Sequence, residues 1–148
     1  MFQKKEVTSE LNPSKIIENS QNIDIDENNK VEKTTYCNDK YYITVFKFIG
    51  NDLSCFNELC KPYEILQSVW PELIKIFKYK KDKKLIYAIP RYNTDEDTIY
   101  KSLIEELIRF TSFFYYTALE NENGDQKIAE TMSAGFVGQY INFIVPSK

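Results

Sequence analysis

The sequence predicts an α+β fold that is mainly helical and has a minor β component. A wide apolar stripe over about residues 95–120 indicates a long central helix. Helical patterns also cover about residues 62–79 and 125–145, and we expect these helices to pack against the central one. Two short runs, 41–49 and 85–89, are rich in aromatic and β-branched residues, which is typical of strands or extended segments.

The chain has 148 residues, which suffice for one domain and not for two full cores. We expect residues 1–35 to form a flexible polar arm, because their sparse apolar residues cannot offset the entropy lost on ordering. The arm could instead order on a partner through its isoleucines at 16–17 or 23–25. Residues 36–148 then make up a single globular domain.

The elements of this domain follow in order from the run 41–49, which Gly50 stops. Pro62 suits the first position of a helix, where the missing N–H is harmless. Pro71 should then kink or restart this helix, because proline cannot donate the backbone hydrogen bond of a helix interior. A lysine-rich turn separates this helix from the run 85–89.

The central helix has the clearest signals. Thr94 and Asp97 fit the looser form of a capping box at its start. Apolar residues then recur at spacings of three and four, namely Ile99, Leu103, Leu107, Phe110, Phe114 and Ala118. The last helix has the same spacing, although Gly135 and Gly138 either weaken it or allow another helix to approach closely.

The composition excludes several kinds of catalysis. The chain contains no histidine, which excludes Ser–His and Cys–His nucleophiles and histidine-ligated metals. Its four glycines form no phosphate-binding loop. The acidic residues 95–97 suit helix capping better than cation binding, and Glu105 and Glu106 point in different directions on a helix. We therefore expect a protein that is not an enzyme and has no cofactor or metal.

The cysteine content and the first residues of the chain indicate an intracellular protein that is not secreted. The net charge is −3, and Cys37, Cys55 and Cys60 are an odd number without metal-ligand spacing. The first residues lack the apolar core of a secretory signal, and no apolar run is long enough for membrane insertion. We expect a cytoplasmic or other intracellular setting with reduced thiols.

The aromatic run 110–116 surrounds almost the whole circumference of one helix. A chain this short cannot cover every side of it, so part of the run should contact another protein. The alternative is a central helix that is simply well wrapped. The candidate partner-binding residues are Phe113, Tyr116, Phe136, Gln139, Tyr140 and Asn142.

A lysine cluster is the main electrostatic feature. The candidate basic patch is Lys78, Lys80, Lys81, Lys83 and Lys84. Such a run is usually a solvated turn, but Phe77 and Tyr79 alternate with the lysines, which is a feature of nucleic-acid-binding surfaces. The net charge of −3 disfavours that function, because nucleic-acid binders usually carry a basic surplus.

The second half of the chain contains an ordered set of short motifs. They are Ile-Tyr-Ala-Ile-Pro at 86–90, the acidic residues 95–97, a helix with Leu103, Leu107 and Thr111, Phe-Val at 136–137 and Gln-Tyr-Ile-Asn at 139–142. With these motifs, residues 85–143 resemble subunit 3 of the actin-related protein 2/3 complex, which nucleates branched actin filaments. The resemblance implies a mostly helical subunit that has no catalytic residues and is held by other subunits.

The chain also departs from that family. The tryptophan pair that precedes Phe-Val in the family is absent, and Met132 and Ser133 occupy this region. The family's arginine before the glutamine position is missing. So is its proline-rich insert ahead of the Ile-Tyr-Ala segment.

Three functions stand as hypotheses. The first is a non-catalytic structural or interaction subunit of a multiprotein complex, with the actin-nucleating complex as the named case. The second is a longin-like or related α+β adaptor of membrane traffic, in which 41–49 and 85–89 pair in one sheet against the long helix. The third is an accessory nucleic-acid-binding subunit that uses the lysines of 75–84. An all-helical core would favour the actin-complex subunit, and a sheet containing both runs would favour the adaptor.

Overall fold

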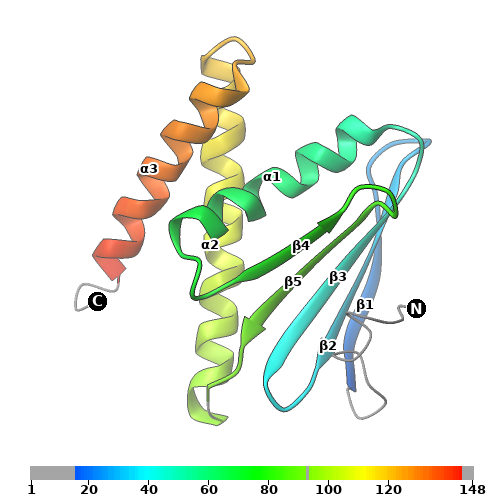
Figure 1. Ribbon diagram of the computed structural model, residues 1–148, viewed down its shortest axis with the longest axis vertical. Helices are drawn as coiled ribbons and strands as arrows, with labels where there is room; N and C mark the ends of the chain where they lie inside the picture. Colours follow the sequence, from blue (N-terminus) through cyan, green and yellow to red (C-terminus); the bar gives the residue numbers. More distant parts are fainter. Residues whose placement is uncertain (1–15, 93, 145–148) are drawn as a thin grey trace.

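The structure, a computed structural model, describes the backbone of residues 16–92 and 94–144 and the side chains of residues 22–92 and 99–144. In this part of the chain, five strands form one antiparallel sheet that packs with three helices, which confirms the α+β class (Figure 1). The elements run in the order β1 (Ile16–Asp24), β2 (Lys30–Cys37), β3 (Tyr41–Ile49), α1 (Leu53–Val69), β4 (Lys75–Tyr79), β5 (Lys84–Pro90), α2 (Thr94–Asn121) and α3 (Gln126–Ile144).

The two runs predicted to be extended are strands β3 and β5, which lie side by side in the sheet order β1-β2-β3-β5-β4. They pair antiparallel along their length. Side chains of a strand alternate between the two faces of a sheet. Phe46 and Leu85 therefore face the helices, whereas Ile43 and Ile86 belong to a second cluster on the opposite face.

A hairpin of β1 and β2 extends the sheet where the sequence predicts no strand. The expectation that residues 1–35 form a flexible polar arm is wrong for these two strands, and residues 1–15 lie outside the described part. The turn is held by Asp26, which accepts hydrogen bonds from the Asn28 backbone N–H at 2.8 Å and from Asn29 Nδ2 at 2.9 Å. Because ladder hydrogen bonds use only the backbone, a polar strand can pair without an apolar pattern.

The predicted helix 62–79 is wrong at both ends. α1 begins earlier because Asp52 caps it, with its Oδ1 atom accepting from the Ser54 backbone N–H at 3.0 Å. The helix ends at Val69 because Trp70, the residue before a proline, takes a non-helical backbone with φ of −140° and ψ of 69°. Beyond this break the chain forms β4, an edge strand joined to β5 by a tight turn.

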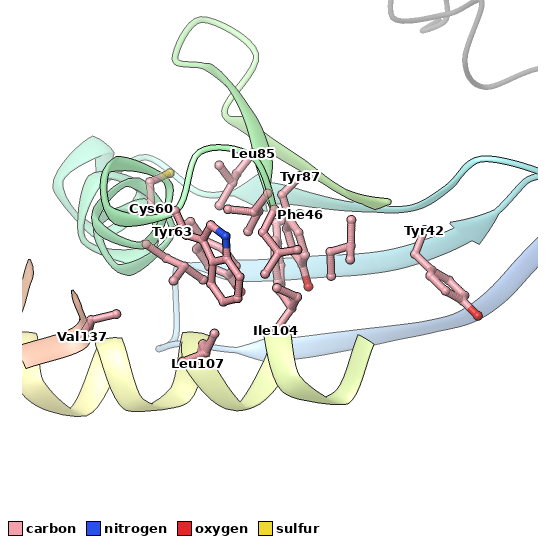
Figure 2. Packing of buried hydrophobic residues seen from close by; sticks show 14 of the residues in the cluster. Tyr42, Phe46, Cys60, Tyr63, Leu85, Tyr87, Ile104, Leu107 and Val137 are labelled. Atoms are coloured by element: carbon pink, nitrogen blue, oxygen red, sulfur yellow. The ribbon is translucent and has the colours of Figure 1, made fainter. Parts of the chain in front are cut away.

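The main core lies between the sheet and the helices. Figure 2 shows Phe46, Leu85 and Tyr87 directed from the sheet toward Ile104 and Leu107 of α2. α1 and α3 add side chains to the same cluster. The predicted packing of the central helix against two others is therefore confirmed, with α1 in contact with both α2 and α3 (Figure 1).

The two predicted C-terminal helices are confirmed as α2 and α3. The predicted cap at Thr94 and Asp97 involves side chains outside the described ones. Gly124, at φ of 83°, makes the turn between the helices, and its N–H donates to the Leu119 carbonyl at 2.8 Å. This turn sets α3 antiparallel to α2.

Gly50, the residue that follows β3, allows a test of how close packing there affects stability. A Cβ atom at Gly50 would clash with the Asn29 side chain and lie 2.9 Å from the Asn28 carbonyl oxygen. Because the β1–β2 turn would have to shift, Gly50→Ala should lower the free energy of unfolding by about 1–3 kcal/mol in urea denaturation.

The matched control is Gly135→Ala on α3. A Cβ atom there meets nothing within 4 Å, so the change should raise the free energy of unfolding by about 0.5–1 kcal/mol. A loss of stability of the same size in both variants would contradict a specific role for the close approach at Gly50.

Candidate partner-binding surface

One side of the α2–α3 hairpin packs against α1, and we call it the inner side. Tyr115 and Ala118 of α2 and Ala129 of α3 are buried with Ile65 of α1. Residues three or four positions apart share one face of a helix. The side chains on the opposite face of each helix therefore point away from α1, and several of them are aromatic.

Aromatic rings from both helices contact one another along the outer side of the hairpin. Between ring centroids, Phe110 lies 4.8 Å from Tyr140 and 6.1 Å from Phe114. Phe114 lies 5.3 Å from Phe136 and 5.9 Å from Phe113. Separations of about 4.5–7 Å are those of favourable aromatic pairs. We call these five residues, Phe110, Phe113, Phe114, Phe136 and Tyr140, the aromatic strip.

Much of the aromatic strip is open to solvent. Phe113 is 65% exposed and Phe136 is 48% exposed. Phe143, one turn beyond Tyr140 on α3, is 81% exposed, and Met132, one turn before Phe136, is also exposed. Single exposed apolar residues are normal, but a contiguous apolar surface on two helices is typical of a binding site.

Three of the six residues predicted to bind a partner belong to the strip, namely Phe113, Phe136 and Tyr140. Gln139 and Asn142 are exposed on α3, beside the strip. Their role in binding stays a prediction.

The sequence analysis did not select Phe110 or Phe114. It also did not select Phe143, which is the most exposed aromatic side chain among the described residues. The signal for Phe143 was its spacing of three from Tyr140, which places both on one face of α3. The two residues of α2 were assigned to the core stripe, because a sequence does not show which side of a helix faces α1.

The sixth predicted residue, Tyr116, has a structural contact instead. Pro62 lies inside α1 and has no N–H, so it leaves the carbonyl of Glu58 without its helical partner. The Tyr116 hydroxyl of α2 donates to that carbonyl oxygen at 2.7 Å. Partial burial, with the nearby Glu58 charge, raises the pKa of Tyr116 to about 12, so the hydroxyl remains a donor at neutral pH.

The five lysines of the predicted basic patch do not form one surface. Lys78 pairs with Glu64 of α1, with 2.7 Å between Nζ and Oε2. The Lys83 ammonium donates to the carbonyl oxygen of Gly50. The other members are Lys84, half-buried in β5, and two exposed residues of the turn after β4, Lys80 and Lys81.

An ion-pair group joins α1 to α3. Lys61 Nζ lies 2.9 Å from Glu130 Oε2 and 3.5 Å from Glu64 Oε1. Partial burial lowers the pKa of Lys61, but the hydrogen bond and charge of Glu130 and the charge of Glu64 outweigh it and raise this pKa. Lys61 therefore stays charged and helps to hold α1 against the inner side of the hairpin.

The thiols of α1 are held in their neutral form. Burial raises the pKa of Cys60 to about 12, and a hydrogen bond to Asp52 raises the pKa of Cys55. A neutral thiol is a poorer nucleophile and a poorer metal ligand than a thiolate. Within the described ranges, no cluster of acidic or cysteine side chains could hold a metal ion.

The comparisons with known proteins name no family. No protein-family model, curated protein or solved structure matches the chain. In the part of the chain with described structure, no helix is both long and apolar enough to span a membrane.

The contact of Tyr116 with the proline-interrupted helix is testable by a double-mutant cycle. Tyr116→Phe should lower the free energy of unfolding by about 1 kcal/mol, because the Glu58 carbonyl loses its donor. Pro62→Ala restores a helical N–H to that carbonyl, so Tyr116→Phe should cost less than half as much in this background. Chemical denaturation of the four proteins measures the difference. An equal cost in both backgrounds would contradict the coupling.

Proposed function

We propose that the protein is a non-catalytic interaction subunit of a multiprotein complex and that it binds a partner through the aromatic strip. The observation that supports this is the contiguous exposure of Phe113, Phe136 and Phe143 across two helices. Full burial of such a side chain contributes about 1.5–3 kcal/mol, which the isolated chain does not gain. The lack of histidine and the neutral thiols of α1 support a non-catalytic role.

The partner that fits this surface is an amphipathic helix. A third helix can pack its apolar face against the exposed apolar side of two neighbouring antiparallel helices. On the exposed side of α2, Arg109 Nη2 lies 2.5 Å from Glu106 Oε1, so the charges of this ion pair offset each other. On α3, Gln139 and Asn142 offer neutral hydrogen-bonding groups. The partner helix should therefore present apolar residues at spacings of three and four, bordered by neutral polar residues.

Two assemblies are candidates for this subunit, a membrane-traffic adaptor and the actin-nucleating complex. The sheet supports the adaptor. β3 and β5 pair in one sheet, and Ile104 and Leu107 of α2 pack in the same cluster as Phe46 and Tyr87. This is the arrangement that we expect in a longin-like or related adaptor. In the actin-complex subunit we expect an all-helical core instead. A fold is shared by many functions, so the partners decide between the two.

The test is affinity purification of the tagged chain from its native cell, with mass spectrometry of the proteins that copurify. Phe113→Ala and Phe136→Ala should each weaken binding of the same partner by about tenfold or more, as expected for a central aromatic contact. Ile25→Ala, at an exposed position of the β1–β2 turn, is the matched control and should leave binding unchanged. Circular dichroism verifies that each variant is folded.

The recovered proteins distinguish the assemblies. Subunits of membrane-traffic complexes would favour the adaptor, and actin-related proteins would favour the nucleating complex. Unchanged yields from both strip variants would contradict the proposal. A wild-type chain that sediments as a dimer, with strip variants that sediment as monomers, would assign the strip to a second copy instead.

A further inference from the structure

Strand β4 is a free edge of the sheet. It pairs with β5 on one side, and among the described residues no backbone hydrogen bond reaches its other side. The N–H and C=O groups along such an edge can pair with a strand from another chain. This edge lies on different elements from the aromatic strip.

The side chains of β4 alternate in environment. Phe77 and Tyr79 are both exposed, and Phe77 lies opposite Ile86, which places it on the face of the sheet away from the main core. Ile76 and Lys78 are half-buried on the other face, where Lys78 reaches α1. A strand added beside β4 would therefore find aromatic contacts on one face and α1 on the other.

Positive charge is concentrated along this edge. Lys75, Lys80 and Lys81 are exposed, and none of them has an ion-pair partner in the described part of the chain. Asp82 is the one acidic residue in the sequence 75–84, although the whole chain has a net charge of −3. A second copy of β4 would place lysine against lysine, whereas an acidic strand would be attracted.

A polar cleft of about 280 Å³ borders the end of β4 and the first turns of α1. Its lining includes Glu58 and Lys61 of α1, Lys78 of β4, Lys80 in the turn after β4, Tyr115 of α2 and Gln126 of α3. The cleft therefore offers polar and charged side chains at the end of β4.

We propose that β4 is a docking edge for an extended acidic segment of a partner protein. The segment adds to the sheet as a sixth strand through backbone hydrogen bonds. Its acidic side chains meet Lys75, Lys80 and Lys81, and its apolar side chains contact Phe77 and Tyr79. One polar group of the segment enters the cleft beside Lys80.

A peptide fits these observations better than a nucleic acid. Phosphates could meet the same lysines, but they would leave the free backbone edge of β4 unpaired. The alternative is that the lysines of this edge strand serve to prevent aggregation and bind no partner. In that case no acidic peptide should bind.

The test uses the full chain and a fluorescein-labelled peptide of about ten residues in which Asp or Glu alternates with Val or Ile. Fluorescence polarisation should show saturable binding that weakens as salt is added, because the contact is partly ionic. Amide hydrogen exchange of residues 75–79 should slow when the peptide is bound, since a new strand protects the edge. A peptide of the same composition with proline at alternate positions should not bind.

Charge reversal locates the site. The triple variant Lys75→Glu, Lys80→Glu and Lys81→Glu should weaken peptide binding by about tenfold or more. The matched control has the same net charge and reverses exposed lysines elsewhere, at Lys30, Lys40 and Lys127, and it should retain more of the binding.

Several outcomes overturn the proposal. Absence of peptide binding, or binding without slower exchange at 75–79, rules out strand addition. Equal loss in the two triple variants shows an unspecific charge effect. Binding of an oligothymidylate but not of the peptide assigns the lysines to nucleic acid. Because the peptide does not involve the aromatic strip, each of these results leaves the proposed function untouched.

Discussion

The contact of Tyr63 with Phe46 and Tyr87 joins the sheet to the helices, and the positions of the other helices depend on it. The Tyr63 ring of α1 lies 5.5 Å from the Phe46 ring of β3 and 5.0 Å from the Tyr87 ring of β5. Burial raises the pKa of both tyrosines, to about 12 for Tyr87, so no charge forms in the core at neutral pH. α1 is thereby held over the central strands, and α2 and α3 pack against it.

This placement of α1 decides which rings of the hairpin are structural and which remain exposed. Tyr115 and Tyr116 are neighbours in α2, yet Tyr115 is buried beside Ile65 and Tyr116 donates to the carbonyl that Pro62 leaves free. Both serve the contact between α1 and α2. The aromatic strip lies on the other side of the hairpin, where Phe114 and Tyr140 border the main core and Phe113 and Phe136 remain exposed to solvent.

The two proposed docking surfaces differ in chemistry and share no residue. The aromatic strip is uncharged and lies on two neighbouring helices, which suits recognition by shape and apolar burial. The β4 edge is basic and offers backbone hydrogen bonds, which suits an extended acidic segment. On these two proposals, the subunit would contact two partners in one assembly through separate surfaces.

The sequence by itself determined α2, α3, β3 and β5, because each has an apolar pattern with the period of its own structure. It also indicated that part of the run 110–116 stays uncovered, since one helix of a short chain cannot bury every aromatic residue that it carries, and Phe113 is exposed. The role of Phe113, Phe136 and Tyr140 in binding stays a prediction. Only the tertiary structure decided β1, β2 and β4. Their pairing depends on backbone groups of neighbouring strands. The spacing of apolar residues within one segment does not show which strand it pairs with. The contact of Tyr116 with α1 was likewise invisible in sequence, because it arises from a carbonyl that a proline frees in another helix.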